Sequence, residues 1–204
     1  MGHAVIFQNA IAKILINKNI FMTKFASKIF PKITVYPQSE FDIYCYEHNL
    51  DDDNVENDKS HAYISIIGTK ECLKYYLEED DTTHWFKEDH NNVLNLEFDD
   101  ISQDEIEWEG HTFKGFSEEQ AKKSVDFIDR IVEESKILGE DSRRNFVIHC
   151  RAGMSRSQAF GAFLRDFYPD YFTADYSNLL PHPNKDVYRK LSRFFYKKHK
   201  IYEE

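Results

Sequence analysis

The segment FVIHCRAGMSRS, residues 146–157, indicates the local fold around Cys150. Three apolar residues form a short predicted strand, Cys150 follows near its carboxyl end, and Arg156 lies six residues beyond the cysteine. A helix is predicted over residues 157–167. It ends before Pro169, because proline cannot continue a helix. The sequence therefore predicts a strand–turn–helix unit that places Cys150 at the junction between the strand and the turn.

Strands and helices alternate along the rest of the chain. Ser117 begins a capping box before one helix, and the polar residues 101–116 predict a long loop, which is either a lid over the site or an ordinary insertion. This alternation predicts an α/β fold, a single domain with a central mostly parallel sheet flanked by helices and an active site at the carboxyl ends of the strands. Strands are predicted at residues 33–36, 62–67, 93–98 and 146–148, and helices at 71–77, 117–136, 157–167 and from Asn184 onward.

The turn after Cys150 contains the residue types that phosphoryl transfer needs. A thiol is only a few per cent ionised near pH 7, so its surroundings must stabilise the thiolate nucleophile. The backbone N–H groups of the turn and the amino end of the following helix can do so, and Gly153 lets the backbone curl without a side-chain clash. Arg156 can bind two phosphate oxygens with its planar guanidinium. The sequence therefore predicts an anion-binding loop around a nucleophilic cysteine.

Residues 149–157, His-Cys-Arg-Ala-Gly-Met-Ser-Arg-Ser, resemble the signature His-Cys-x5-Arg-Ser/Thr of the protein tyrosine phosphatase superfamily. The ending Ala-Gly-x-Ser-Arg-Ser is similar to that of the dual-specificity branch. A weaker pattern around the signature covers about residues 60–200. The resemblance implies a compact, atypical phosphatase domain over residues 33–204 with a dual-specificity-phosphatase-like fold.

The resemblance also implies roles for individual residues. Cys150 would be the nucleophile that forms a thiophosphate intermediate, and Arg156 would bind the phosphate. Ser157 would donate a hydrogen bond to the departing thiolate, and His149 would organise the loop. On the residues alone, Ser157 could instead be a helix cap and His149 a purely structural residue. The backbone amides that would line the substrate-binding cradle are those of Arg151, Ala152, Gly153, Met154, Ser155 and Arg156.

A phosphatase of this kind also needs a general acid. In the families that the chain resembles, this acid is an Asp on a loop after an earlier strand. Here the predicted strand ending at Phe98 is followed by Asp99 and Asp100, and Phe98-Asp99-Asp100-Ile101 is similar to the Phe-x-Asp-Ile of some compact bacterial and viral members. We predict that Asp100 is the acid, although it lies farther before the cysteine than in the common pattern. Asp99 and Asp104 are the alternatives, and a solvated acidic turn without a catalytic role is the other interpretation.

The composition of the loop favours protein substrates. Arg151 is the only basic residue among the five that separate the cysteine from the arginine, whereas members that act on highly charged substrates often carry more. We predict hydrolysis of phosphotyrosine, with phosphoserine and phosphothreonine as further substrates, through a cysteinyl-phosphate intermediate. The alternatives are a phosphatase acting on RNA 5′ ends, phosphoinositides or inositol phosphates, and a catalytically weak phosphate-binding adaptor.

The overall charge limits the classes of binding partner that are expected. The 26 basic and 36 acidic side chains give a formal net charge of −10, which argues against non-specific nucleic-acid binding and leaves a phosphorylated protein as the expected partner. Residues 1–32 predict an N-terminal extension, which could form a helix and which contains no acidic residue. No membrane association is expected for the rest of the chain. A role of this extension in targeting or membrane binding is left as an alternative.

Cysteine and histidine usage predicts neither a metal site nor a cofactor. The three cysteines are too few for a disulfide framework, which favours a reducing cytoplasm. Cys72 is either a buried small residue or a partner that forms a disulfide with Cys150 on oxidation. A further group of histidines shows no metal-binding spacing, so surface positions are expected for them. These are His84, His90, His111 and His182.

Overall fold

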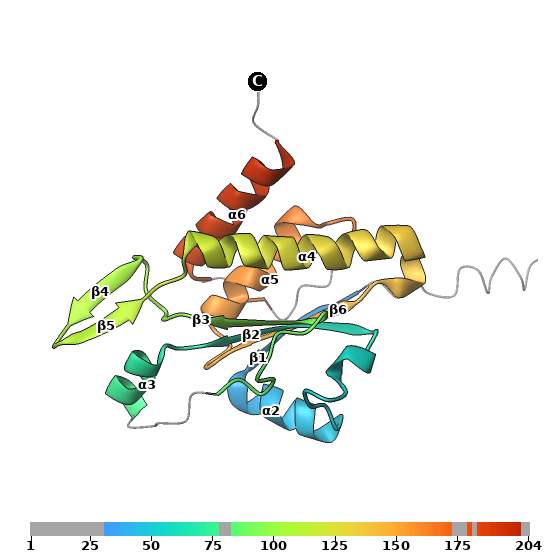
Figure 1. Ribbon diagram of the computed structural model, residues 1–204. Coiled ribbons are helices and arrows are strands. Elements are labelled where there is room, and N and C mark those ends of the chain that lie inside the picture. Colours follow the sequence, from blue (N-terminus) through green and yellow to red (C-terminus); the bar gives the residue numbers. More distant parts are fainter. Residues whose placement is uncertain (1–30, 78–82, 173–178, 181–182, 201–204) are drawn as a thin grey trace, which may run out of the picture. The chain divides into compact units, whose positions relative to one another are not determined.

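The computed structural model describes residues 31–77, 83–172, 179–180 and 183–200 (Figure 1). The predicted N-terminal extension, apart from its last two residues, lies outside these ranges, and so does His182. The strands are β1 (Ile33–Pro37), β2 (His61–Ile67), β3 (Val93–Glu97), β4 (Glu105–Trp108), β5 (His111–Lys114) and β6 (Asn145–Cys150). The helices are α2 (Gln38–Glu47), α3 (Lys70–Leu77), α4 (Glu118–Leu138), α5 (Arg156–Phe167) and α6 (Lys185–His199), with short 3-10 turns η1 (Val55–Asn57) and η2 (Glu140–Ser142).

The main sheet has four parallel strands in the order β1-β6-β2-β3. Its parallel pairing confirms the predicted α/β fold, since each strand is followed by a crossover that returns the chain to the same end. The register places Cys150 of β6 opposite Pro37 of β1, and His149 opposite Ser65 of β2. The carboxyl ends of β1, β2 and β6 therefore lie side by side around Cys150.

Both faces of the sheet are covered, as its apolar strands require. Helices α4, α5 and α6 lie over one face, where Ile64, Leu94 and Ile148 enter the larger core (Figure 1). On the other face, Tyr63 and Val147 pack with residues of α2 in a smaller core. Alternate residues of each strand thus enter opposite cores, which fixes the register of the strand that carries Cys150.

Local sequence signals account for the ends of helices α4 and α6. Ser117 and Gln120 form the predicted capping box, and α4 ends at Gly139, which has a positive φ of 100°. Asn184 caps α6, as predicted, by accepting hydrogen bonds from two backbone N–H groups of the first turn. Among the described residues, none of the helices has both the length and the apolar character that crossing a bilayer requires.

The prediction of a long loop over residues 101–116 is wrong. Strands β4 and β5 form an antiparallel hairpin in which Trp108 pairs with His111, and this hairpin extends from the main sheet in Figure 1. The connecting residues Glu109 and Gly110 both have positive φ, 51° and 82°, which is the backbone conformation of a two-residue hairpin turn. The sequence of β4 is not typical of a strand, because it contains glutamates and charged residues are uncommon in strands.

Candidate active site

Cys150 is the last residue of the central strand β6, and its side chain is buried at the carboxyl edge of the sheet. The turn of residues 151–155 follows, and α5 begins at Arg156. A hydrogen bond from the backbone N–H of Gln38 to the carbonyl of Arg151, 3.1 Å long, attaches this turn to the start of α2. The structure thus has the strand, turn and helix in the order that the sequence predicts.

Gly153 allows the turn to close. Its φ of +67° lies in the region that favours glycine, and a Cβ there would lie 2.7 Å from the backbone nitrogen of Pro37. The Gly153 carbonyl accepts a 2.8 Å hydrogen bond from the Gln158 side chain, whose amide oxygen in turn accepts from the Leu180 N–H. The turn is therefore held between the end of β1, the first turns of α5 and the segment that leads to α6.

The cysteine thiol contacts the start of α5 directly. The Cys150 Sγ lies 3.0 Å from the Ser157 Oγ, and both side chains are buried. Ser155, the residue before the helix, makes no side-chain capping hydrogen bond to α5. The amino end of α5, which carries a partial positive charge, can thus offer its backbone N–H groups to an anion bound at the turn.

Arg156 is buried, and protein carbonyls fix its orientation. Its Nη1 donates to the carbonyls of Ile67 and Phe98, at 3.0 and 2.6 Å, which lie at the carboxyl ends of β2 and β3. The Nε is buried and has no hydrogen-bond partner among the described residues. An arginine that is 7% exposed and keeps an unpaired donor is unusual, because a buried charged group is normally fully hydrogen-bonded. An anion bound in the turn would supply the missing acceptor.

His149 belongs to a chain of three side chains behind the loop. Its Nε2 and the His84 Nδ1 each lie 2.7 Å from the Ser65 Oγ, and the His149 ring stacks on Phe41 with centroids 4.1 Å apart. Burial, followed by the charges of His84 and Arg156, lowers the pKa of His149 to about 3. Burial is likewise the main reason that the pKa of His84 falls to about 4. Both rings are therefore neutral near pH 7.

The expected surface position of His84 is therefore wrong. Its ring is partly buried because the segment before β3 folds against Ser65. His90 is also partly buried, and its Nε2 lies 2.9 Å from an Asp52 oxygen. His111 lies 3.3 Å from a Glu71 oxygen. In the part of the chain that the structure describes, no group of three His, Cys, Asp or Glu side chains could hold a metal ion.

The three candidate acids lie in different surroundings. Asp99 is buried and accepts hydrogen bonds from the Thr69 N–H, the Thr69 hydroxyl and the Lys114 N–H, at 2.7 to 2.8 Å. Asp104 is 83% exposed and pairs with Lys190. Asp100 is also exposed, but its Oδ1 accepts from the hydroxyl of Ser155, in the turn after Cys150, at 2.9 Å. Of the three, Asp100 is the one with a hydrogen bond to this turn.

Several residues of this site were absent from the sequence prediction. Ser65 is a polar residue in the middle of the largely apolar strand β2, a signal that could have identified it. Asn184 was predicted as a helix cap, yet its Nδ2 also lies 2.7 Å from the Asp100 Oδ1. Gln158 and His84 carry no local signal, because their contacts depend on how distant segments pack. The Cys72 thiol is free and partly buried, and burial together with the charge of Asp99 raises its pKa to about 12.

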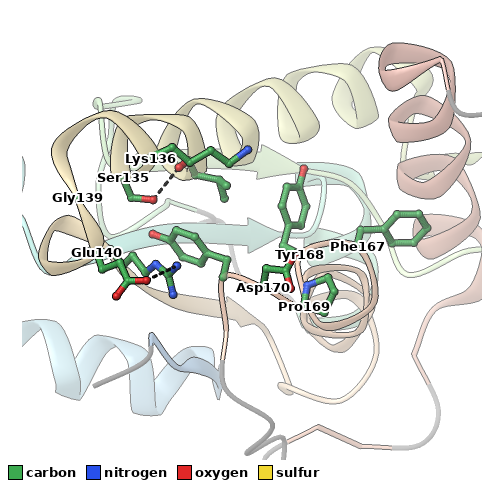
Figure 2. Close-up of a pocket in the computed structure, with 11 residues that line it drawn as sticks. Ser135, Lys136, Gly139, Glu140, Phe167, Tyr168, Pro169 and Asp170 are labelled. Atoms are coloured by element: carbon green, nitrogen blue, oxygen red, sulfur yellow. Dashed lines mark hydrogen bonds and ion pairs between the residues drawn. The ribbon is translucent and has the colours of Figure 1, made fainter. Parts of the chain in front are cut away.

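A separate cavity of about 280 Å³ lies between the carboxyl end of α4 and the segment after α5 (Figure 2). Ser135, Lys136, Tyr168 and Asp170 are among its lining residues. Another lining residue, Arg143, precedes β6 by two positions, so the cavity lies at the amino edge of the sheet, opposite Cys150. None of the predicted site residues lines it.

Comparisons with known proteins assign no family to the chain. No protein-family model and no curated protein matches the chain. A solved structure, that of the human tyrosine phosphatase-like serine/threonine/tyrosine-interacting protein, matches with a TM-score of 0.40 and 14% sequence identity. The match covers 82% of this chain and 93% of that chain. A functional proposal therefore rests on the residues around Cys150.

Proposed function

We propose that the protein is a cysteine-dependent phosphatase that hydrolyses phosphomonoesters through a phosphate bound covalently to Cys150. The observation that carries the proposal is the buried Arg156 side chain with its unpaired Nε, six residues after a buried cysteine that contacts Ser157. A phosphoryl group at the turn would satisfy this donor and the uncapped amino end of α5 together. Phosphoryl transfer depends mainly on such positioning and charge stabilisation.

In the first step the Cys150 thiolate attacks phosphorus. A sulfur–phosphorus bond forms as the bond to the leaving oxygen breaks, and Asp100 donates its proton to that oxygen. Arg156 and the backbone N–H groups of residues 151–156 bind the phosphoryl oxygens. His149, neutral and fixed by Ser65, holds the end of β6 in place and takes no proton.

In the second step water attacks the phosphocysteine. Asp100, now ionised, accepts a proton from this water, and the sulfur–phosphorus bond breaks to release inorganic phosphate. The electron pair of that bond returns to sulfur. The Ser157 hydroxyl, 3.0 Å from the sulfur, donates a hydrogen bond to the departing thiolate.

The substrates that we propose are phosphorylated proteins in a reducing cytoplasm, with phosphotyrosine first and phosphoserine and phosphothreonine as further substrates. Met154 in the turn is 61% exposed, which gives the rim of the site an apolar contact for a peptide or an aromatic ring. Arg151 is the one basic residue between Cys150 and Arg156. Enzymes of this kind that act on highly charged substrates often carry more basic residues at these positions. The single charge therefore supports protein substrates over inositol phosphates and RNA 5′ ends.

The proposal is tested by phosphate release from an aryl phosphate and from phosphopeptides. The Cys150→Ser variant is expected to lose turnover while it still binds phosphate analogues, because the cradle remains. Cys45→Ala is the matched control, since Cys45 is a second buried cysteine in the smaller core and does not line the turn. Turnover that persists in Cys150→Ser would contradict the proposal. Phosphate binding without turnover in the wild-type protein would instead indicate an adaptor.

A further inference from the structure

Asn184 uses both ends of its side-chain amide. The Oδ1 accepts hydrogen bonds from the backbone N–H groups of Asp186 and Val187, at 3.0 and 3.1 Å, and so caps α6. Because backbone N–H groups can only donate, the oxygen of the amide must face the helix. The Nδ2 group must then face away from α6, which fixes an orientation that is often ambiguous for asparagine.

The outward-facing Nδ2 contacts the proposed acid. It donates to the Asp100 Oδ1 at 2.7 Å, and the Ser155 hydroxyl donates to the same oxygen at 2.9 Å. The Asn184 backbone N–H also donates to the Ser155 carbonyl at 3.2 Å. These three hydrogen bonds form a closed ring that joins the catalytic turn, the end of β3 and the start of α6.

Helix α6 gives this ring a rigid support. Val187 and Leu191 are fully buried, and α6 packs against both α4 and α5. The Lys190 amine is buried and donates to the Phe116 carbonyl at 2.6 Å, which ties the helix to the segment before α4. Asp100, by contrast, is exposed and would have free rotamers without its two donors. A fixed donor removes that freedom and aligns the carboxyl group.

We infer that Asn184 is a positioning residue that holds Asp100 over the catalytic turn and determines which of its oxygens carries the proton. Both donors bind Oδ1, and no described residue donates a hydrogen bond to Oδ2. The proton that passes to the leaving oxygen in the first step therefore lies on Oδ2, and Oδ2 accepts the proton of water in the second. This inference rests on the proposed function and adds to it a residue outside the catalytic loop and the acid itself.

The test uses Asn184→Ser, because serine also caps helices but is too short to reach Asp100. The expected result is a loss of about 10-fold or more in kcat on phenyl phosphate, since misplacing a catalytic group by about 1 Å can cost about 100-fold. On dinitrophenyl phosphate the loss should be several times smaller, because this leaving group needs no proton. The matched control is Ser117→Ala, which removes the cap of α4. It should lower thermal stability and leave both rates near those of the wild-type protein.

A double-mutant cycle separates positioning from a general structural role. In the Asp100→Asn background, Asn184→Ser should cause no further loss, because the group that it positions has already been removed. Equal losses on both substrates, or a further loss in this background, would overturn the inference. So would wild-type kinetics of Asn184→Ser when Asp100→Asn is slow.

The same measurements distinguish this inference from the proposed function. If Cys150→Ser abolishes turnover but Asp100→Asn does not slow it, the positioning role fails and the cysteine-dependent reaction stands. If no turnover depends on Cys150, both fail.

Discussion

Asp99 and Asp100 are neighbours in sequence with opposite surroundings. They follow strand β3 where the chain bends, because the Ile101 N–H donates to the Asp99 carbonyl at 2.9 Å. Asp99 is buried and joins Thr69 to Lys114, while Asp100 is exposed and accepts hydrogen bonds from Ser155, in the turn after Cys150, and from Asn184. One carboxylate supports the fold, and the other is the proton donor that we propose.

Exchanging each aspartate for asparagine should separate these roles. Asp100→Asn is expected to lower kcat on phenyl phosphate by about 10² to 10⁴-fold and to flatten the pH dependence between acidic and neutral values, because the amide cannot transfer a proton. Asp99→Asn is the matched control. It should destabilise the fold by about 1–3 kcal/mol, since hydrogen bonds to a buried acceptor are lost, with a pH profile like that of the wild-type protein.

Steady-state rates and urea unfolding of both variants check this prediction. A normal pH profile for Asp100→Asn together with a flattened one for Asp99→Asn would exchange the two roles.

The residues of the site differ in how far the sequence could predict them. Cys150, Gly153, Arg156 and Ser157 lie within one short segment, so their spacing alone indicates an anion-binding turn. The contact between Ser65 and His149 depends on the register of two strands that lie far apart in the chain. Such contacts are set by tertiary packing, which local sequence patterns do not encode.

At the scale of elements, prediction succeeded where hydrophobic periodicity is strong. The four parallel strands and α3, α4, α5 and α6 lie close to their predicted ranges. Helix α2 was not predicted, because aromatic residues are frequent in it and only Phe41 and Cys45 are buried. The hairpin β4–β5 differs from the predicted loop because its glutamates obscure the alternation of Ile106 and Trp108.

The missed elements nevertheless shape the surroundings of the site. The start of α2 contacts the turn after Cys150 through the hydrogen bond between the Gln38 N–H and the Arg151 carbonyl. The base of the hairpin is fixed by Asp99, which accepts from the Lys114 N–H. The polar contacts of Asp99 thus support the end of β3, from which Asp100 reaches the turn.

At the scale of the whole molecule, the buried histidines predict how stability depends on pH. The pKa values of His149 and His84 are lowered from 6.5 to about 3 and about 4, mainly by burial. Between these values and 6.5 the unfolded chain binds more protons than the folded one, so stability falls as the pH falls through this window. Each histidine should contribute a slope of about 1.4 kcal/mol per pH unit.

Urea unfolding at several pH values between about 6 and 4.5 tests this prediction. Hydrogen bonds to His61 and Tyr63 lower the pKa of Asp58 to about 2, against the effect of burial. Asp58 therefore adds its own pH dependence only below the range of this measurement. The variant His84→Asn preserves a hydrogen-bonding group near Ser65 and removes one titrating ring, so the slope should fall to about half. An unchanged slope in this variant would show that the buried histidines do not control acid stability.

The central claim is that Cys150 carries the phosphoryl group during turnover. Rapid acid quenching during hydrolysis of an aryl phosphate, followed by mass spectrometry of the peptide around Cys150, tests it most directly. We predict one phosphate on Cys150, at higher occupancy in Ser157→Ala, because the thiolate then departs without its hydrogen-bond donor. Turnover with phosphate on another residue, or with none on Cys150 in either protein, would contradict this account.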